Sequence, residues 1–129
     1  MAVKAGSFTP GNTGNVSVSG LTFLPTEITF RTGPQSGVTD TGKISRCDGW
    51  ATAANQSYDT FYHDSTGTQQ SAATGKCLYS LNRVSGTITA VHDATLVSFD
   101  TIVPGVSYGF TLNFATYDGS RQIRYIARD

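Results

Sequence analysis

The sequence has few charged side chains, which make up 14% of its 129 residues, whereas a typical soluble domain has about a quarter. The 9 basic and 9 acidic residues cancel to a formal net charge of +0. A neutral chain lacks the long-range positive field that draws proteins to DNA phosphates or to anionic lipid. The charge balance therefore predicts neither a nucleic-acid partner nor a membrane partner.

Cysteine is also scarce, because the chain contains only Cys47 and Cys77. Their spacing is typical of neither a zinc site nor a redox pair, so we predict two buried thiols, with a disulfide as the open alternative. The N-terminus has no signal-peptide pattern, and no segment approaches the roughly 18 apolar residues of a membrane-spanning helix. We expect a soluble protein made in a cytoplasm.

Groups suited to catalysis are few. His63 and His92 are the only histidines, each followed by an aspartate, and Glu27 is the only glutamate. No Gly-x-Ser-x-Gly elbow selects a nucleophile from the many serines. We interpret both histidines as strand-end residues hydrogen-bonded to their neighbours, and we predict no enzyme activity, no cofactor and no metal.

One glycine- and lysine-containing segment, residues 37–43, has a spacing similar to that of a phosphate-binding loop. It lacks the Ser or Thr that would hold Mg²⁺, because Ile44 occupies that position. We interpret this segment as a turn.

What the chain does contain is hydroxyl groups, glycine and aromatic rings. About a quarter of the residues are Ser or Thr, there are 14 glycines, and hydrophobic residues make up 38% with 11% aromatic. This is enough apolar material for a core, and the length suits one domain over residues 1–129.

Alternation of apolar and polar residues predicts strands, and no stretch keeps a helical period. The predicted strands cover residues 15–19, 27–31, 77–82, 87–92, 96–100, 110–114 and 122–128, with two less regular ones between 43 and 63. Asp118 and Gly119 predict a hairpin between the last two strands, and the polar run at 64–76 predicts a long exposed loop. The fold class is therefore all-β: an antiparallel β-sandwich, jelly-roll-like, of about eight strands.

Aromatic side chains are the candidate contact residues, because amphipathic rings serve both sugar stacking and protein interfaces. The candidate interface or ligand anchors are Trp50, Tyr58, Tyr62, His63 and Tyr79. For Trp50 the alternative is an anchor in the core or at a subunit interface.

Several blocks of the sequence stand out together: GSFT at 6–9, TGNVSVSGLTFLPTEITF at 13–30, GWAT at 49–52, NQS at 55–57, LVSFD at 96–100, GFTLNF at 109–114 and IRYIA at 123–127. These blocks resemble a family of small tailed-bacteriophage virion proteins. They span nearly the whole chain and contain no catalytic residue. The resemblance implies a structural or host-interaction protein on the phage particle.

Two further elements are a Phe-Leu-Pro sequence beginning at Phe23 and a closing strand that contains Tyr125. They resemble elements of H-type lectins, which are trimeric β-sandwiches, with the Phe-Leu-Pro element shortened and Tyr125 in the place of a tryptophan. This resemblance implies a sandwich fold and trimeric assembly.

From these observations we expect a non-enzymatic virion protein, assembled in the host cytoplasm as a homotrimer. The first hypothesis is a capsid decoration protein that stabilises the particle exterior by binding the major capsid protein or other virion proteins. The alternative is a tail-associated module that binds a receptor or a host-surface glycan.

Overall fold

The computed structural model describes residues 1–32 and 43–129, and within these it contains ten strands and no helix. The strands are β1 (Val3–Phe8), β2 (Gly14–Leu21), β3 (Glu27–Thr32), β4 (Ile44–Thr52), β5 (Gln56–Asp64), β6 (Gly67–Thr74), β7 (Leu78–Val84), β8 (Thr87–Val103), β9 (Ser107–Thr116) and β10 (Ile123–Arg128). Apart from Lys43, the segment interpreted as a turn at 37–43 lies outside the described residues.

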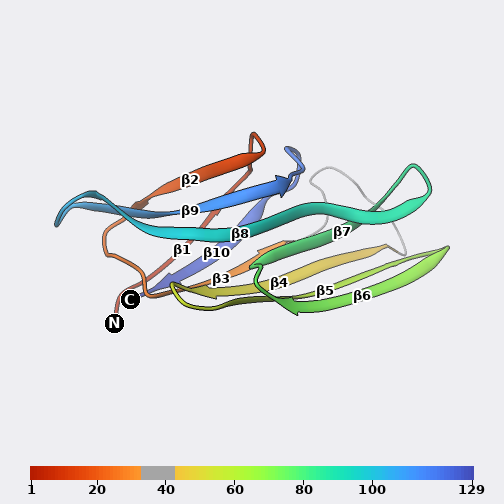
Figure 1. Ribbon diagram of the computed structural model, residues 1–129, viewed down its shortest axis with the longest axis horizontal. Helices are drawn as coiled ribbons and strands as arrows, with labels where there is room; N and C mark the ends of the chain where they lie inside the picture. Colours follow the sequence, from red (N-terminus) through yellow and green to blue (C-terminus); the bar gives the residue numbers. More distant parts are fainter. Residues whose placement is uncertain (33–42) are drawn as a thin grey trace.

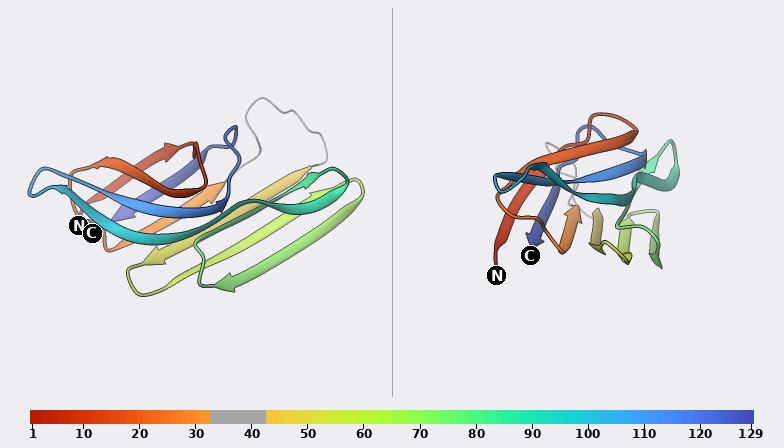
Figure 2. Two further views of the ribbon diagram at one scale, coloured as in Figure 1. Left: turned by 45° about the horizontal axis from the view of Figure 1, so that its top comes forward. Right: turned by 60° about the vertical axis from the view of Figure 1, so that its left-hand side comes forward.

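The strands form two antiparallel sheets that pack face to face (Figures 1 and 2). The six-stranded sheet has the order β1-β10-β3-β4-β5-β6, and the four-stranded sheet has the order β2-β9-β8-β7. The predicted antiparallel β-sandwich is confirmed, with ten strands instead of about eight. The chain alternates between sheets over β1 to β3 and again from β9 to β10, whereas β3 to β6 and β7 to β9 are meanders.

Alternation along the strands places the core between the two sheets, as predicted. In β9, Phe110, Leu112 and Phe114 are buried, and the Phe110 ring lies 5.0 Å from that of Tyr125 in β10 across the sandwich. Exposed and buried residues alternate over the whole of β10. Because every second side chain of a strand points to one face, this pattern alone assigns the inner side of both strands.

Asp118 and Gly119 form a turn, but not the predicted hairpin. Strands β9 and β10 belong to different sheets, so the turn carries the chain from one layer to the other. The Asp118 carboxylate accepts hydrogen bonds from the backbone and the hydroxyl of Ser120, and the Asp118 carbonyl accepts one from Arg121. Local turn chemistry is therefore as expected, while the pairing of the flanking strands is decided by their packing.

The polar run at 64–76 is not a loop, because its centre forms β6 and pairs with β5 from Ser57 to Asp64 without a bulge. As an edge strand, β6 is exposed along most of its length. Its backbone hydrogen bonds give it strand structure without an apolar face, and the apolar alternation used for prediction is therefore missing.

The two strands predicted at 87–92 and 96–100 are one strand, the 17-residue β8. The pairing of β8 with β9 is irregular at three places, one of them between Asp93 and Ala94. A β-bulge accommodates an extra residue without ending the strand, and Asp93 therefore does not interrupt it. The β8–β9 hairpin projects beyond the other strands (Figure 1) and exposes Ile102, Val103 and Val106.

The interior also contains polar side chains, at the end of the sandwich where Arg121 enters. Arg121 is 1% exposed and donates from Nη1 to Ser45 Oγ at 2.8 Å. His92, on β8, is 0% exposed, and neither ring nitrogen has a hydrogen-bond partner within residues 1–32 and 43–129. The prediction of a strand-end histidine bonded to its neighbours is wrong for His92, because its ring points into the core and packs against Phe114.

Candidate functional site

The outer face of the six-stranded sheet carries the polar side chains that the inner face excludes. In β3, β4 and β10 the outward positions include Arg31, Asp48 and Arg124, which lie side by side in the strand register. Ser7 of β1 lies beyond Arg124, and Asp59 of β5 lies beyond Asp48. One cross-strand row thus has two adjacent cations followed by two adjacent anions.

A groove of about 750 Å³ is open on this face over β1, β10, β3 and β4. Its polar lining residues are Ser7, Thr29, Arg31, Asp48, Gln122 and Arg124. Backbone of Gly6 and Gly49 contributes to its floor.

The groove has an excess of positive charge at its β10 side. Arg31 Nε donates to Asp48 Oδ1 at 2.9 Å, but the two side chains are 70% and 52% exposed, so solvent screens their attraction. Arg124 has no carboxylate within 4.0 Å in the part of the chain that the structure describes. Gln122 Nε2 donates to Ser7 Oγ at 3.1 Å beside it. The groove therefore offers a guanidinium, an amide and hydroxyl groups at one end and a carboxylate at the other.

Trp50 does not line this groove, but it lies at its margin, beside the lining residue Thr29. It is half-buried on the outer face of β4, directly across from Thr29 and two positions from Asp48. Its neighbours on the strand, Gly49 and Ala51, point inward and are buried. Of the five predicted contact residues, Trp50 is the one adjacent to the groove.

The other four candidates do not join it. Tyr58 and Tyr62 lie on the inner face of β5, 9% and 1% exposed, and the Tyr58 ring lies 5.1 Å from that of Tyr79 in the opposite sheet. His63 is exposed on the outer face of β5, where its Nδ1 lies 2.8 Å from Thr68 Oγ1. The segment from 58 to 63 is a strand with two faces, so the contact residues predicted in it do not share one surface.

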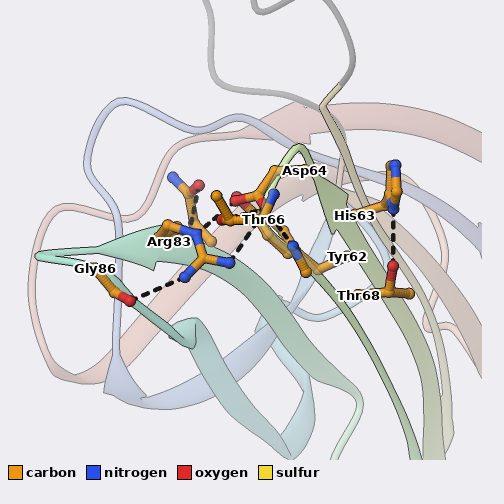
Figure 3. A network of polar contacts seen from close by, with 9 residues as sticks. Tyr62, His63, Asp64, Thr66, Thr68, Arg83 and Gly86 are labelled. Carbon is orange, nitrogen blue, oxygen red and sulfur yellow. Dashed lines mark hydrogen bonds and ion pairs between the residues drawn. The ribbon is translucent and has the colours of Figure 1, made fainter.

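A separate polar network joins the β5–β6 turn to β7 (Figure 3). Arg83 donates to Asp64 from Nε at 2.6 Å and from Nη2 at 3.1 Å, while Tyr62 and the backbone of Thr66 donate to the same carboxylate. These bonds, that from Arg83 above all, hold the pKa of Asp64 well below its usual range. His63 points away from Asp64, toward Thr68. Every member of the network is satisfied by another member, which makes it a connection between the sheets.

Both cysteines are buried free thiols, as predicted. Burial raises the pKa of Cys47 to about 11 and that of Cys77 to about 12. A thiol with so high a pKa stays protonated at neutral pH and is a poor nucleophile and metal ligand. Within residues 1–32 and 43–129, no three His, Cys, Asp or Glu side chains are grouped so that they could hold a metal ion.

None of the residues that line the groove was among the predicted site residues. Arg31 and Arg124 were already assigned outward positions by the alternation in their strands, and this was the available signal. What the sequence does not state is that β10 lies between β1 and β3, which brings Ser7, Arg124 and Arg31 together.

Comparison with protein-family models, with curated proteins and with solved structures finds no match to this chain. In the part of the chain that the structure covers, no helix is long and apolar enough to cross a membrane.

Proposed function

We propose that this chain is a non-enzymatic module that binds glycans in the groove beside Trp50, at the surface of a bacteriophage particle. The observation that carries the proposal is an open groove with an indole at its margin and a set of guanidinium, carboxylate, amide and hydroxyl groups along it. The sequence resemblance to phage virion proteins supports the location. The groove favours the glycan-binding hypothesis over capsid decoration, which the sequence alone ranked first.

The groups in the groove match the chemistry of a sugar. The flat face of an indole packs against the apolar C–H face of a pyranose ring, while Asp48 accepts hydrogen bonds from hydroxyls, and Arg31 donates to hydroxyl and ring oxygens. Thr29 lies in register between Trp50 and Ile126, so a ring stacked on Trp50 extends toward the groove. A shallow open site of this kind binds one sugar weakly, and repeated copies on a particle raise the avidity.

Trp50 is the only tryptophan, so its fluorescence reports binding directly. Replacing Trp50 with Ala is expected to weaken glycan binding at least about tenfold, which corresponds to the loss of roughly 1.4 kcal/mol of contact energy. Calorimetric titration of the variant measures the loss, because its fluorescence signal is gone.

Phe61→Ala provides the matched control for Trp50→Ala. Phe61 is a half-buried aromatic residue on the same outer face, in β5, and unlike Trp50 it lies beside no residue that lines the groove. We expect the Phe61→Ala variant to bind glycan as tightly as the wild type does. Glycan binding that is equally weakened by both substitutions, or absent from the folded wild type across a broad glycan array, would overturn the proposal.

Capsid decoration as a homotrimer is the second candidate, and two observations favour it. The projecting β8–β9 hairpin exposes Ile102, Val103 and Val106, with Val106 66% exposed. The free edges of the six-stranded sheet, β1 and β6, run in opposite directions, because five successive antiparallel pairings separate them. A second copy can therefore add edge to edge, and such head-to-tail contacts form a closed ring when the rotation closes.

In that role the hairpin would bind only the assembled lattice of the major capsid protein, so that mass action stabilises the shell. Val106→Asp is expected to reduce attachment to particles at least about tenfold, since it places a charge in an apolar contact. Cosedimentation with particles lacking the protein measures this, with Trp50→Ala as the control. Intact heads that fail to adsorb when the protein is missing would contradict decoration, and a monomer by light scattering at micromolar concentration would contradict the trimer.

A further inference from the structure

We propose that the groove selects glycans that carry a carboxylate, and that Arg124 binds this carboxylate; the inference rests on the glycan binding proposed above. The class of ligand is an oligosaccharide with an acidic sugar, such as a uronic or a sialic acid. Four features of the groove lead to this ligand.

The first is the position of Arg124 in the sheet. It is exposed on the outer face of β10, directly across from Arg31 of β3. Like charges placed opposite each other in an antiparallel pair destabilise the sheet. An anion bound between the two guanidinium groups removes that repulsion.

The second is the difference between the two arginines. Asp48 already compensates Arg31 at 2.9 Å, whereas Arg124 has no carboxylate within 4.0 Å anywhere in residues 1–32 and 43–129. Elsewhere on the surface Arg83 pairs with Asp64, Lys76 with Asp93 and Arg128 with Glu27, and the exposed Lys4 and Arg46, which pair with no carboxylate within residues 1–32 and 43–129, lie outside the groove. Arg124 is therefore the charge in the groove that a ligand can satisfy.

The third is the set of groups beside Arg124. Gln122 and Ser7 line the same end of the groove and are joined by a hydrogen bond of 3.1 Å. A planar carboxylate matches the fork of donors on a guanidinium, and the amide and the hydroxyl supply neighbouring donors. The hydroxyls of the same sugar then reach Arg31 and Asp48 across the groove.

The fourth is the charge of the remaining face, which excludes a longer polyanion. Asp48 and Asp59 lie opposite each other on β4 and β5, and the chain as a whole has a formal net charge of +0. A nucleic acid or a phosphate-rich polymer crossing the sheet would meet these two carboxylates. A single carboxylate at the β10 end of the groove avoids them.

The test compares ligands that differ only in the carboxylate. Wild-type protein is titrated with a uronic acid oligosaccharide and with its carboxyl-reduced, neutral form, and in a second arm with sialyllactose and lactose. We expect the acidic member of at least one pair to bind about tenfold or more tightly at low salt, and this preference to shrink as NaCl is raised.

Arg124→Gln should abolish the preference for the acidic ligand while leaving the neutral one bound, and Arg124→Lys should retain part of it. Arg46→Gln is the matched control, because Arg46 is exposed on the same face in β4 but lies outside the groove. Since the side chains of Arg124 and Arg46 both point to solvent, the melting curves of these variants should match that of the wild type. If Arg124→Gln is unstable, Arg124→Lys provides a second readout, because its remaining preference for the acidic ligand should still depend on salt.

The outcomes separate this inference from the proposed function. Equal binding of acidic and neutral ligands by the wild type, or a preference that survives Arg124→Gln, overturns the carboxylate assignment while glycan binding stands. Two results overturn the glycan-binding proposal itself. One is a wild-type protein that binds neither form, and the other is a Trp50→Ala variant that binds both forms as tightly as the wild type does.

Discussion

Replacing Gly49 with Ala is expected to lower the free energy of unfolding by about 3 kcal/mol, at the upper end of the range for overpacked cores. A Cβ at Gly49 would lie 1.6 Å from the backbone oxygen of Cys77. That carbonyl cannot swing aside like a side chain, because Cys77 is fully buried and its amide donates to Ala94 at 3.1 Å. Strand β4 must therefore move, and with it Asp48 and Trp50 on either side of the glycine.

Three other glycines turn this prediction into a graded series. A Cβ at Gly109 would lie 2.0 Å from the backbone oxygen of Val18, whereas at Gly6 it would meet the end of the Tyr125 side chain and no backbone atom. At Gly11 nothing lies within 4 Å. In urea unfolding, the loss in free energy of unfolding should be larger for Gly49→Ala and Gly109→Ala than for Gly6→Ala. Gly11→Ala should be within about 0.5 kcal/mol of the wild type. A Gly49→Ala protein as stable as the Gly11→Ala control would show that the two sheets do not approach as closely as described.

The sequence was most informative where a strand has one buried face. In β9 and β10 the positions of Phe110, Leu112, Ile123 and Tyr125 identify the inner face without any knowledge of the partner strands. It was least informative at β6, an edge strand of Thr, Gln, Ser and Ala with little apolar burial to mark it. A periodic signal exists only where one side of a strand is excluded from water.

The candidate site was predictable only in part for a related reason. Trp50 is conspicuous by residue type, and its outward position follows from β4. Tyr58 and Tyr62 are equally conspicuous, but their alternation with Asp59 and Phe61 places them in the core. The groove depends on which strands are neighbours, and long-range pairing of this kind is decided by the packing of the whole sandwich.

Acidification should destabilise this protein through one residue, His92. Burial, together with the nearby charge of Arg121, lowers the pKa of His92 to about 4 from an ordinary value of 6.5. Asp118 has the opposite, weaker effect on this pKa. Between pH 6.5 and 4 the unfolded chain therefore binds a proton that the folded chain does not, so stability rises with pH across this window and falls as the pH is lowered.

The expected loss on going from pH 7.5 to pH 4.5 is about 2.5 kcal/mol, measured as the shift in free energy of unfolding in urea. Asp64 does not interfere, because a carboxylate with a lowered pKa contributes fully above its unfolded pKa of 3.8 and loses that contribution only at lower pH. His92→Leu should abolish most of the difference in free energy of unfolding between pH 7.5 and pH 4.5, whatever its effect on stability at either pH.

His63→Gln is the control for this experiment, because the chain has only two histidines and His63 is exposed on the outer face of β5. It should keep the full loss of stability on acidification. A pH dependence that disappears with His63 and persists without His92 would reverse the assignment. We expect His63→Gln to lose stability on acidification as the wild type does, and His92→Leu not to. This result would show that the His92 imidazole is uncharged in the folded protein, and that the polar end of the core around His92 and Arg121 is the acid-sensitive part of the sandwich.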